Sequence, residues 1–394
     1  MGEHRLKRVG LILEEYSPEK YKVLASAMKR SNKEIIQDLI DSGLKGRGGA
    51  GFLTGLKWKL AAEQEADQKY VICNADEGEP GTFKDRAILS EVPRKVLSGM
   101  GICAKVIGAT KGFIYLRGEY KYLVPQLQKE IDEFHVHAEI LGLDFKIEIF
   151  LGSGAYVCGE ETALLNSMEG KRGEPRNKPP FPTESGYLGK PTVVNNVETL
   201  VSAMLVCKIG PEEFKKLGIQ DSHGSKLFSV SGDTPKPGIY DLEFGLPLDE
   251  FVKEFGDGDT KAVQVGGASG FCVPRKKFSQ TTIGYQGGLT GDNLPTGGSM
   301  MIFNSSRSMY NVLRNYLEFF EEESCGQCTP CRVGIQQLTR GIEAVKKGEK
   351  PPEYLQILLK LTETMKITAK CGLGQSVANS FSSIVENFRE EMIY

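Results

Sequence analysis

The sequence predicts an α/β protein with a largely parallel sheet, followed by a small α+β module and a C-terminal helical bundle. Three observations lead to this fold class. Strand and helix patterns alternate over the first part of the 394 residues, as is typical of layered domains with parallel strands. Short strands then follow one another, and the chain ends in a series of amphipathic helices. A chain of this length is expected to form two or three domains.

The first part of the chain starts with an irregular arm that ends before Ser31. Ser31 and Glu34 match a capping box, and the helix that they begin is expected to end near Gly43. Strands and helices alternate after the following glycine-rich segment. The expected elements are a strand at residues 69–73, a helix at 93–108, a strand at 112–116, a helix at 120–141, a strand at 145–150 and a helix at 194–207. This alternation favours parallel strands connected by helices.

The pattern changes near residue 220. The expected elements of a small module are strands at residues 226–230, 238–242 and 262–265, with a helix at 247–255. Four helices follow, at residues 310–322, 333–346, 353–366 and 376–390. We therefore expect three domains, at residues 1–220, 221–305 and 306–394.

The composition excludes several classes of function. Lys and Arg number 49 against 51 Asp and Glu, so a net charge of −2 provides no general field for nucleic acid or anionic lipid. The four histidines are scattered, and no H-E-x-x-H, G-x-S-x-G or Walker phosphate-loop motif is found. The longest uncharged stretch, residues 371–385, is too short and too polar to cross a membrane, and no secretory signal is expected. A cytoplasmic protein is expected.

The nine cysteines form two groups. Five are scattered among small or apolar residues and are expected to be buried small hydrophobes; they are Cys73, Cys103, Cys158, Cys207 and Cys272. The other four form a ligand pattern: Cys325, Cys328 and Cys331 have C-x-x-C-x-x-C spacing, and Cys371 lies far downstream. Three close thiols and one remote thiol favour a 4Fe-4S cluster. Zinc is the alternative, although it usually takes paired C-x-x-C knuckles, and disulfides are a third interpretation.

A glycine-rich segment, residues 46–52, contains G-x-G-x-x-G at Gly46, Gly48 and Gly51. A dinucleotide fingerprint should follow a strand, whereas this segment follows a predicted helix. Its backbone N–H groups, together with Arg47 and Lys57, could still bind a phosphate or pack against a planar ring. A flexible loop is the alternative interpretation.

Polar turns follow two of the predicted strands, at the edge where open α/β sheets bind ligands. Residues 74–81 carry three carboxylates and an amide, which could accept hydrogen bonds from a ribose or a ring, and residues 156–162 also follow a predicted strand. The proline-stiffened loop at residues 171–182 carries four cations that could face a diphosphate, and residues 194–199 offer amides at a strand-to-helix junction. Solvated turns, a rigid linker and a plain N-cap are the respective alternatives.

These segments together resemble one family. It is the NADH-oxidising, flavin-carrying subunit of respiratory complex I, which also occurs as a module in NAD-linked hydrogenases, formate dehydrogenases and bifurcating enzymes. The matching motifs lie in the expected order, at residues 46–52, 74–79, 156–161, 171–182, 194–199, 324–332 and 371–374.

The resemblance implies a fold and a set of site residues. It implies a Rossmann-like flavin and nucleotide domain, a ubiquitin-like (soluble-ligand-binding β-grasp) module and a four-helix bundle that carries one 4Fe-4S cluster. The FMN-binding residues would be Gly46, Arg47, Gly48, Gly49, Gly51, Lys57, Asn74, Asp76, Glu77, Tyr156, Gly159, Glu160, Val194, Asn195, Asn196 and Thr199. NADH would use Phe52, Glu79, Glu161 and Lys178, and the cluster would use Cys325, Cys328, Cys331 and Cys371.

The resemblance also implies an activity. NADH would give a hydride to FMN, and single electrons would pass to the 4Fe-4S cluster and on to a thioredoxin-like 2Fe-2S subunit and further electron-transfer subunits. No protein acid or base is required, because the cofactors carry out the chemistry. Leu60 departs from the family, which often has an adenine-stacking aromatic there. The alternatives are the same module in another assembly, or a non-catalytic iron–sulfur or zinc scaffold.

Overall fold

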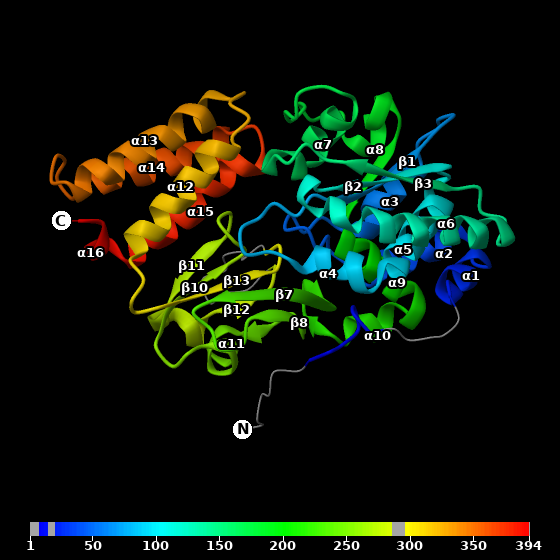
Figure 1. Ribbon diagram of the computed structural model, residues 1–394, viewed down its shortest axis with the longest axis horizontal. Helices are drawn as coiled ribbons and strands as arrows, with labels where there is room; N and C mark the ends of the chain where they lie inside the picture. The colour runs from blue at the N-terminus through cyan, green and yellow to red at the C-terminus, as the bar shows by residue number, and fades with distance from the viewer. Residues whose placement is uncertain (1–7, 15–19, 286–295, 394) are drawn as a thin grey trace.

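The computed structural model describes residues 8–14, 20–285 and 296–393. Figure 1 shows two sheets beside a group of C-terminal helices. The first sheet lies among the helices of the first part of the chain, and the second sheet lies below the C-terminal helices in this view.

The first sheet is parallel, as the sequence predicts, and it has four strands where the sequence predicts three. They are β1 (Tyr70–Ala75), β2 (Lys111–Leu116), β3 (Lys146–Leu151) and β4 (Thr192–Asn196), arranged in the order β3-β2-β1-β4. Every neighbouring pair is parallel. The carboxyl ends of the strands therefore lie at one edge, where ligand sites of such sheets are found.

Each face of this sheet packs into a different core. Val71, Cys73 and Ala75 of β1 join a core that includes α5 (Pro93–Ile107) and α9 (Val197–Ile209). Ile72, on the opposite face of the same strand, joins a second core with α7 and the C-terminal helices. This alternation follows from the two-residue period of a strand.

The remaining helices of the first part surround this sheet. They are α1 (Lys22–Met28), α2 (Asn32–Asp41), α3 (Thr54–Ala62), α4 (Lys84–Glu91), α6 (Val124–Ile140), α7 (Glu161–Met168), α8 (Pro182–Ser185) and α10 (Pro211–Lys215). The capping box of Ser31 and Glu34 is present at the start of α2, as predicted. Helix α1 falls within the segment that was expected to be an irregular arm.

One predicted helix begins later than expected. Val194 and Asn195 belong to β4, and the helix expected from residue 194 starts at Val197. Asn196 ends the strand in an extended conformation, and its side chain accepts a hydrogen bond from the N–H of Glu198. The residues on both sides of this cap are largely apolar, so the sequence has no periodicity that shows where the strand ends and the helix begins.

The second sheet and the elements packed on it form the small module that follows the first part of the chain. Its strands are β7 (Ser225–Gly232), β8 (Gly238–Glu243), β10 (Thr260–Val265), β11 (Phe271–Pro274) and β13 (Ser299–Asn304), in the order β11-β10-β13-β7-β8. The β13–β7 pair is parallel, and the other neighbouring pairs are antiparallel. Helix α11 (Leu248–Phe255) packs Phe251 and Phe255 into the core of this module. The short strands β5 (Gly218–Ile219), β6 (Ser222–His223), β9 (Leu246–Pro247) and β12 (Thr282–Ile283) form two further pairs.

The C-terminal region is helical, as predicted. The helices are α12 (Met309–Glu323), α13 (Thr329–Lys346), α14 (Tyr354–Thr368), α15 (Gly372–Asn387) and the short α16 (Arg389–Met392). Their buried side chains share one core with Ile72 and Tyr115 of the first sheet. In the described ranges, no helix combines the length and apolar character that crossing a membrane requires.

Helix α15 also contacts the small module. The N–H of Cys272, in β11, donates to the Ser383 hydroxyl of α15 at 2.9 Å. The Asn379 side chain of the same helix donates to the carbonyl of Ser269 at 3.0 Å. These contacts place α15 beside the small module, and the core shared with Ile72 and Tyr115 connects the C-terminal helices to the first sheet, so that three parts of the chain can contribute to one site.

Candidate functional site

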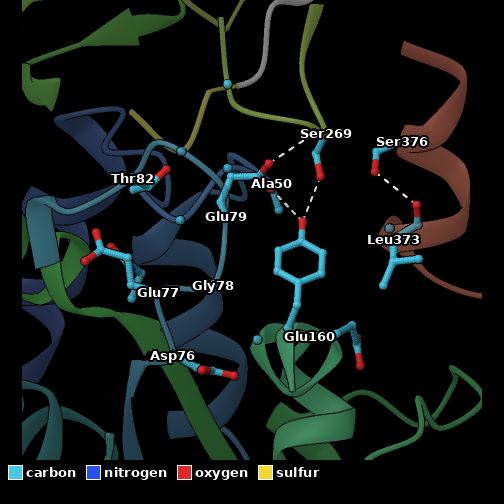
Figure 2. Close-up of a pocket in the computed structure, with 18 of the residues that line it drawn as sticks. Ala50, Asp76, Glu77, Gly78, Glu79, Thr82, Glu160, Ser269, Leu373 and Ser376 are labelled. Carbon is cyan, nitrogen blue, oxygen red and sulfur yellow. Dashed lines mark hydrogen bonds between the residues drawn. The ribbon is translucent and has the colours of Figure 1, made fainter. Parts of the chain in front are cut away.

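A cavity of about 770 Å³ opens at the carboxyl end of the first sheet. Its walls come from the glycine loop (residues 46–52), the acidic turn after β1, the short helix η2 (Tyr156–Gly159), a loop of the small module and the start of α15. Figure 2 shows Asp76, Glu77 and Glu79 on one side of this cavity and Leu373 and Ser376 of α15 on the other. The volume falls within the ~300–1,000 Å³ range that is typical of cofactor and ligand sites.

The glycine loop presents bare backbone to the cavity. It is closed at its base, where the N–H of Gly46 donates to the carbonyl of Phe52 at 2.8 Å. Gly48, Gly49 and Gly51 line the cavity, and the last two have φ values of 113° and 67°, which disfavour any side chain. A Cβ at Gly51 would lie 2.7 Å from the ring of Tyr285. The loop therefore fits a flat or phosphorylated ligand that approaches the main chain closely.

Two carboxylates of the acidic turn are buried in different ways. Glu77 accepts hydrogen bonds from the N–H groups of Asp85 and Arg86 at 2.8 and 3.1 Å, at the start of α4. Burial and the neighbouring Asp85 raise the pKa of Glu77 to about 7. Burial also raises the pKa of Asp76 to about 7, and one of its carboxylate oxygens has no hydrogen-bond partner among the described residues. An acceptor left open at a cavity wall fits a ligand with hydroxyl or ring N–H donors.

Glu79 is held by a group of hydrogen bonds that crosses between two parts of the chain. The Tyr156 hydroxyl donates to Glu79 Oε2 at 2.6 Å, and the N–H of Ser269 donates to Glu79 Oε1 at 3.0 Å (Figure 2). The Tyr156 and Ser269 hydroxyl oxygens lie 2.7 Å apart. Burial raises the pKa of Glu79, and these hydrogen bonds oppose that rise. The carboxylate is therefore fixed in position at the cavity.

A set of linked ion pairs lies beside the large cavity. Glu161 lies between two lysines, 3.0 Å from Lys57 Nζ and 2.8 Å from Lys178 Nζ, and Lys178 also lies 2.9 Å from Glu160. Although burial acts to raise it, the two lysines hold the pKa of Glu161 below its usual value. The ring of Phe52 is 48% exposed, and Lys57 Nζ lies 5.9 Å from its centre. An exposed aromatic beside paired charges fits an aromatic ligand with polar substituents.

The structure brings many of the predicted site residues to the cavity wall. They are Gly48, Gly49, Gly51, Asn74, Asp76, Glu77, Glu79, Tyr156, Gly159, Glu160 and Asn196. Others lie behind it: Gly46, Arg47, Val194, Asn195 and Thr199 support the wall, and Phe52, Lys57, Glu161 and Lys178 lie outside the lining. Asn195, for example, accepts a hydrogen bond from the indole N–H of Trp58 at 2.8 Å.

Sequence reasoning missed several wall residues. Lys84 and Asp85 line the cavity at the start of α4, Ser269 comes from the small module, and Asn379 comes from α15. The acidic turn that precedes α4 was a usable signal for Lys84 and Asp85. Ser269 and Asn379 carry no motif, because long-range packing alone brings them to the site.

The four cysteines of the ligand pattern surround one small second cavity. Cys328 precedes the first residue of α13, Cys331 lies in its first turn, and Cys371 precedes the first residue of α15. Helix N-termini carry partial positive charge, which stabilises thiolates. In the described part of the chain, no three His, Cys, Asp or Glu side chains are arranged to hold a single metal ion. Four thiols around a common space fit the 4Fe-4S cluster that the cysteine spacing favours.

The two cavities share a wall. Val157, from η2, and Leu373, from the first turn of α15, line both the large cavity and the cysteine cavity. A group bound in the large cavity and a group bound by the cysteines would therefore both contact Val157 and Leu373.

Known proteins match both sites. Residues 39–204 match the Nuo51 FMN-binding domain, and residues 311–394 match the NADH-ubiquinone oxidoreductase-F iron-sulfur binding region. The chain is 45% identical to the NAD-reducing hydrogenase HoxS subunit alpha of Cupriavidus necator over 91% of its own length, but it spans only 60% of that protein. It is 41% identical to the NADP-reducing hydrogenase subunit HndC of Solidesulfovibrio fructosivorans (94% of this chain, 78% of that one). It is 39% identical to the corresponding subunit of the NADH-quinone oxidoreductase of Aquifex aeolicus (94% and 88%).

A solved structure agrees with these relatives. The crystal structure of an NAD⁺-reducing [NiFe]-hydrogenase in the H₂-reduced state has a TM-score of 0.89 and 39% sequence identity to this chain. The match covers 99% of this chain and 66% of that one.

A flavin-sized cavity that shares a wall with a four-cysteine site defines a redox subunit that joins a flavin to an iron–sulfur cluster. The similarity to these relatives covers nearly the whole chain. The chain belongs to the Nuo51/NuoF family of NADH oxidoreductase subunits, which bind FMN and a 4Fe-4S cluster and which NAD-reducing hydrogenases share.

Proposed function

We propose that this chain is the electron-input subunit of a larger redox complex, in which NADH is oxidised at the large cavity and electrons leave through the cysteine site. The observation that carries the proposal is the shared wall: Val157 and Leu373 line both sites. When bound, FMN can accept a hydride and give up its electrons one at a time, and the 4Fe-4S cluster can carry single electrons.

The residues of the protein bind the two cofactors, orient them and enclose them. Gly48, Gly49 and Gly51 offer main-chain contact to FMN, and the open oxygen of Asp76 accepts a hydrogen bond from it. The cluster ligands would be Cys325, Cys328, Cys331 and Cys371. Gly46, Arg47, Asn195 and Thr199 contribute by supporting the wall rather than by lining it.

NADH would bind along the exposed side of the site. Phe52 offers an aromatic face, and Glu79 offers a fixed carboxylate to a ribose or carboxamide. Glu161 and Lys178 provide paired charges at the mouth. Leu60, which is 38% exposed, offers the adenine an apolar contact without aromatic stacking.

The proposal is tested by the spectrum and the metal content of the purified protein. We expect flavin absorbance that bleaches when NADH is added, and about four iron atoms per chain. Metal analysis and absorbance spectroscopy measure both. Protein that contains zinc and no flavin would contradict the proposed function.

Glu79 is expected to favour NADH over NADPH. A carboxylate near the 2′ position repels the 2′-phosphate of NADPH, so Glu79→Ala should raise the NADPH/NADH ratio of kcat/KM by on the order of tenfold. Steady-state kinetics with both nucleotides measure this ratio. The charge-preserving control Glu79→Asp should keep the preference for NADH, and an unchanged ratio in Glu79→Ala would remove the assigned role.

The parent assembly is also a proposal. Sequence identity to hydrogenase subunits is at least as high as identity to NADH-quinone oxidoreductase subunits, which makes a hydrogenase module the second candidate.

We also propose a thioredoxin-like 2Fe-2S partner and a cytoplasmic location. We propose three domains, at residues 1–220, 221–305 and 306–394, in which the middle domain is ubiquitin-like and the last is a four-helix bundle that carries the cluster. Mass analysis of co-purifying subunits distinguishes the assemblies.

A further inference from the structure

Residues of the small module form hydrogen bonds with two consecutive residues at the start of the glycine loop. The hydroxyl of Tyr285 donates to the carbonyl of Gly46 at 2.5 Å, and Lys226 Nζ donates to the carbonyl of Arg47 at 2.7 Å. In the opposite direction, Arg47 Nη2 donates to the carbonyl of His223 at 2.7 Å. Two consecutive peptide groups and one side chain of the loop are thus bonded to residues from another part of the chain.

These contacts are buried. Lys226 and Arg47 have no exposed surface, and Tyr285 is 6% exposed. The Arg47 guanidinium lies 4.8 Å from the centre of the Phe244 ring, within the small module. Buried hydrogen bonds of this kind are not exchanged for bonds to water, so their loss leaves the partner unsatisfied.

Lys226 also connects the loop to a charged residue of the cavity wall. Its Nζ lies 3.0 Å from Glu198 Oε2, and the same oxygen lies 2.9 Å from Nζ of Lys84, which lines the cavity. Burial lowers the pKa of Lys226 to about 7, and Glu198 opposes this effect. The contact with the loop is therefore part of a buried network rather than an isolated surface pair.

The direction of the peptide groups follows from these bonds. In a planar trans peptide, the carbonyl of one residue and the N–H of the next point in opposite directions. The carbonyl of Gly46 points to Tyr285, and the N–H of Arg47 accordingly donates to the hydroxyl of Thr199, at 2.8 Å. By the same rule, the Arg47 carbonyl that accepts from Lys226 directs the N–H of Gly48, a cavity-lining residue, away from the Lys226 ammonium group.

We propose that Lys226 and Tyr285 are positioning residues for flavin binding, because they hold the peptide groups of the glycine loop in the orientation that presents the Gly48 N–H to the cofactor. Tyr285 also lines the large cavity, and because its ring is kept in a phenylalanine, Tyr285→Phe removes only the hydroxyl bond to Gly46. This inference rests on the proposed function, in which the large cavity binds FMN.

The test is an FMN titration of the full chain with its cluster assembled, after removal of the flavin. Tyr285→Phe removes only the hydroxyl and is expected to raise the Kd for FMN by roughly three- to tenfold. Lys226→Met removes a charged donor and is expected to raise the Kd by more than tenfold. Tyr240→Phe and Lys236→Met are matched controls on the exposed edge of the same module, where the Tyr240 hydroxyl donates to the Lys236 carbonyl at 3.2 Å. Both controls should bind FMN as the parent chain does.

A second measurement separates positioning from general stability. The Tm of FMN-bound Tyr285→Phe should fall by more than the Tm of the flavin-free variant, so that the increase in Tm that FMN provides shrinks, while the absorbance of the cluster stays near that of the parent. An unchanged Kd in Tyr285→Phe would overturn the inference, and so would a loss of Tm that is equal with and without FMN. If Lys226→Met does not fold, Tyr285→Phe alone decides. A parent chain that fails to bind FMN would instead contradict the proposed function.

Discussion

Replacing Cys371 with alanine is expected to release most of the iron from the protein. The parent should contain about four iron atoms per chain, and Cys371→Ala should retain only a small fraction of them, because each thiolate holds one corner of a 4Fe-4S cluster. Colorimetric iron analysis and the low-temperature EPR spectrum of the reduced protein measure the loss. FMN binding should persist, since Cys371 does not line the large cavity.

A cysteine outside the ligand pattern provides the control. Cys207 lies on α9, in a core that does not contain the four ligand cysteines, so Cys207→Ala should keep its iron. Full iron content in Cys371→Ala, or equal losses in both variants, would contradict the assignment of Cys371 as a ligand.

Replacing Glu198 with glutamine is expected to lower the free energy of unfolding by about 3–5 kcal/mol. Glu198 is fully buried and pairs with Lys84 and Lys226, which are also buried. Glutamine keeps the shape of the side chain but removes the negative charge, so the buried ammonium groups of Lys84 and Lys226 lose the carboxylate that they share. Chemical denaturation of the flavin-free full chain, followed by circular dichroism, measures the change.

The control for this prediction is an exposed ion pair. Lys59 Nζ and Glu63 Oε1 lie 3.8 Å apart on α3, with side chains 48% and 57% exposed. Glu63→Gln should change the unfolding free energy by less than about 1 kcal/mol. A comparable effect of the two substitutions would mean that the buried pairs around Glu198 do not stabilise the fold as argued.

The parts of the fold that follow local rules were predictable. The capping box at Ser31, the alternating strands and helices and the four main C-terminal helices all depend on neighbours within one or two turns. The strand β4 and the helix α9 were not separated correctly, because the boundary at Asn196 lies inside a continuous apolar run. Strands β11 and β13 were missed, since their pairing partners in the small module determine them.

The site shows the same division. The cysteine spacing predicts a common cavity, and the four thiols do surround one. Arg47 was expected to face the cofactor, yet its side chain is buried against His223 and Phe244. A cation in a glycine-rich segment carries no local signal for the direction of its side chain. Ser269, which fixes Glu79, and Lys226, which fixes the loop, reach the site only through tertiary packing.

The contact between Tyr285 and Gly46 has a consequence for biosynthesis, because it joins residues 239 positions apart. The glycine loop leaves the ribosome long before the segment that completes it. A nascent chain that has reached only the first sheet therefore carries the loop without the bonds that orient its peptide groups. We therefore expect FMN to bind after the small module has been translated rather than during synthesis of the first domain.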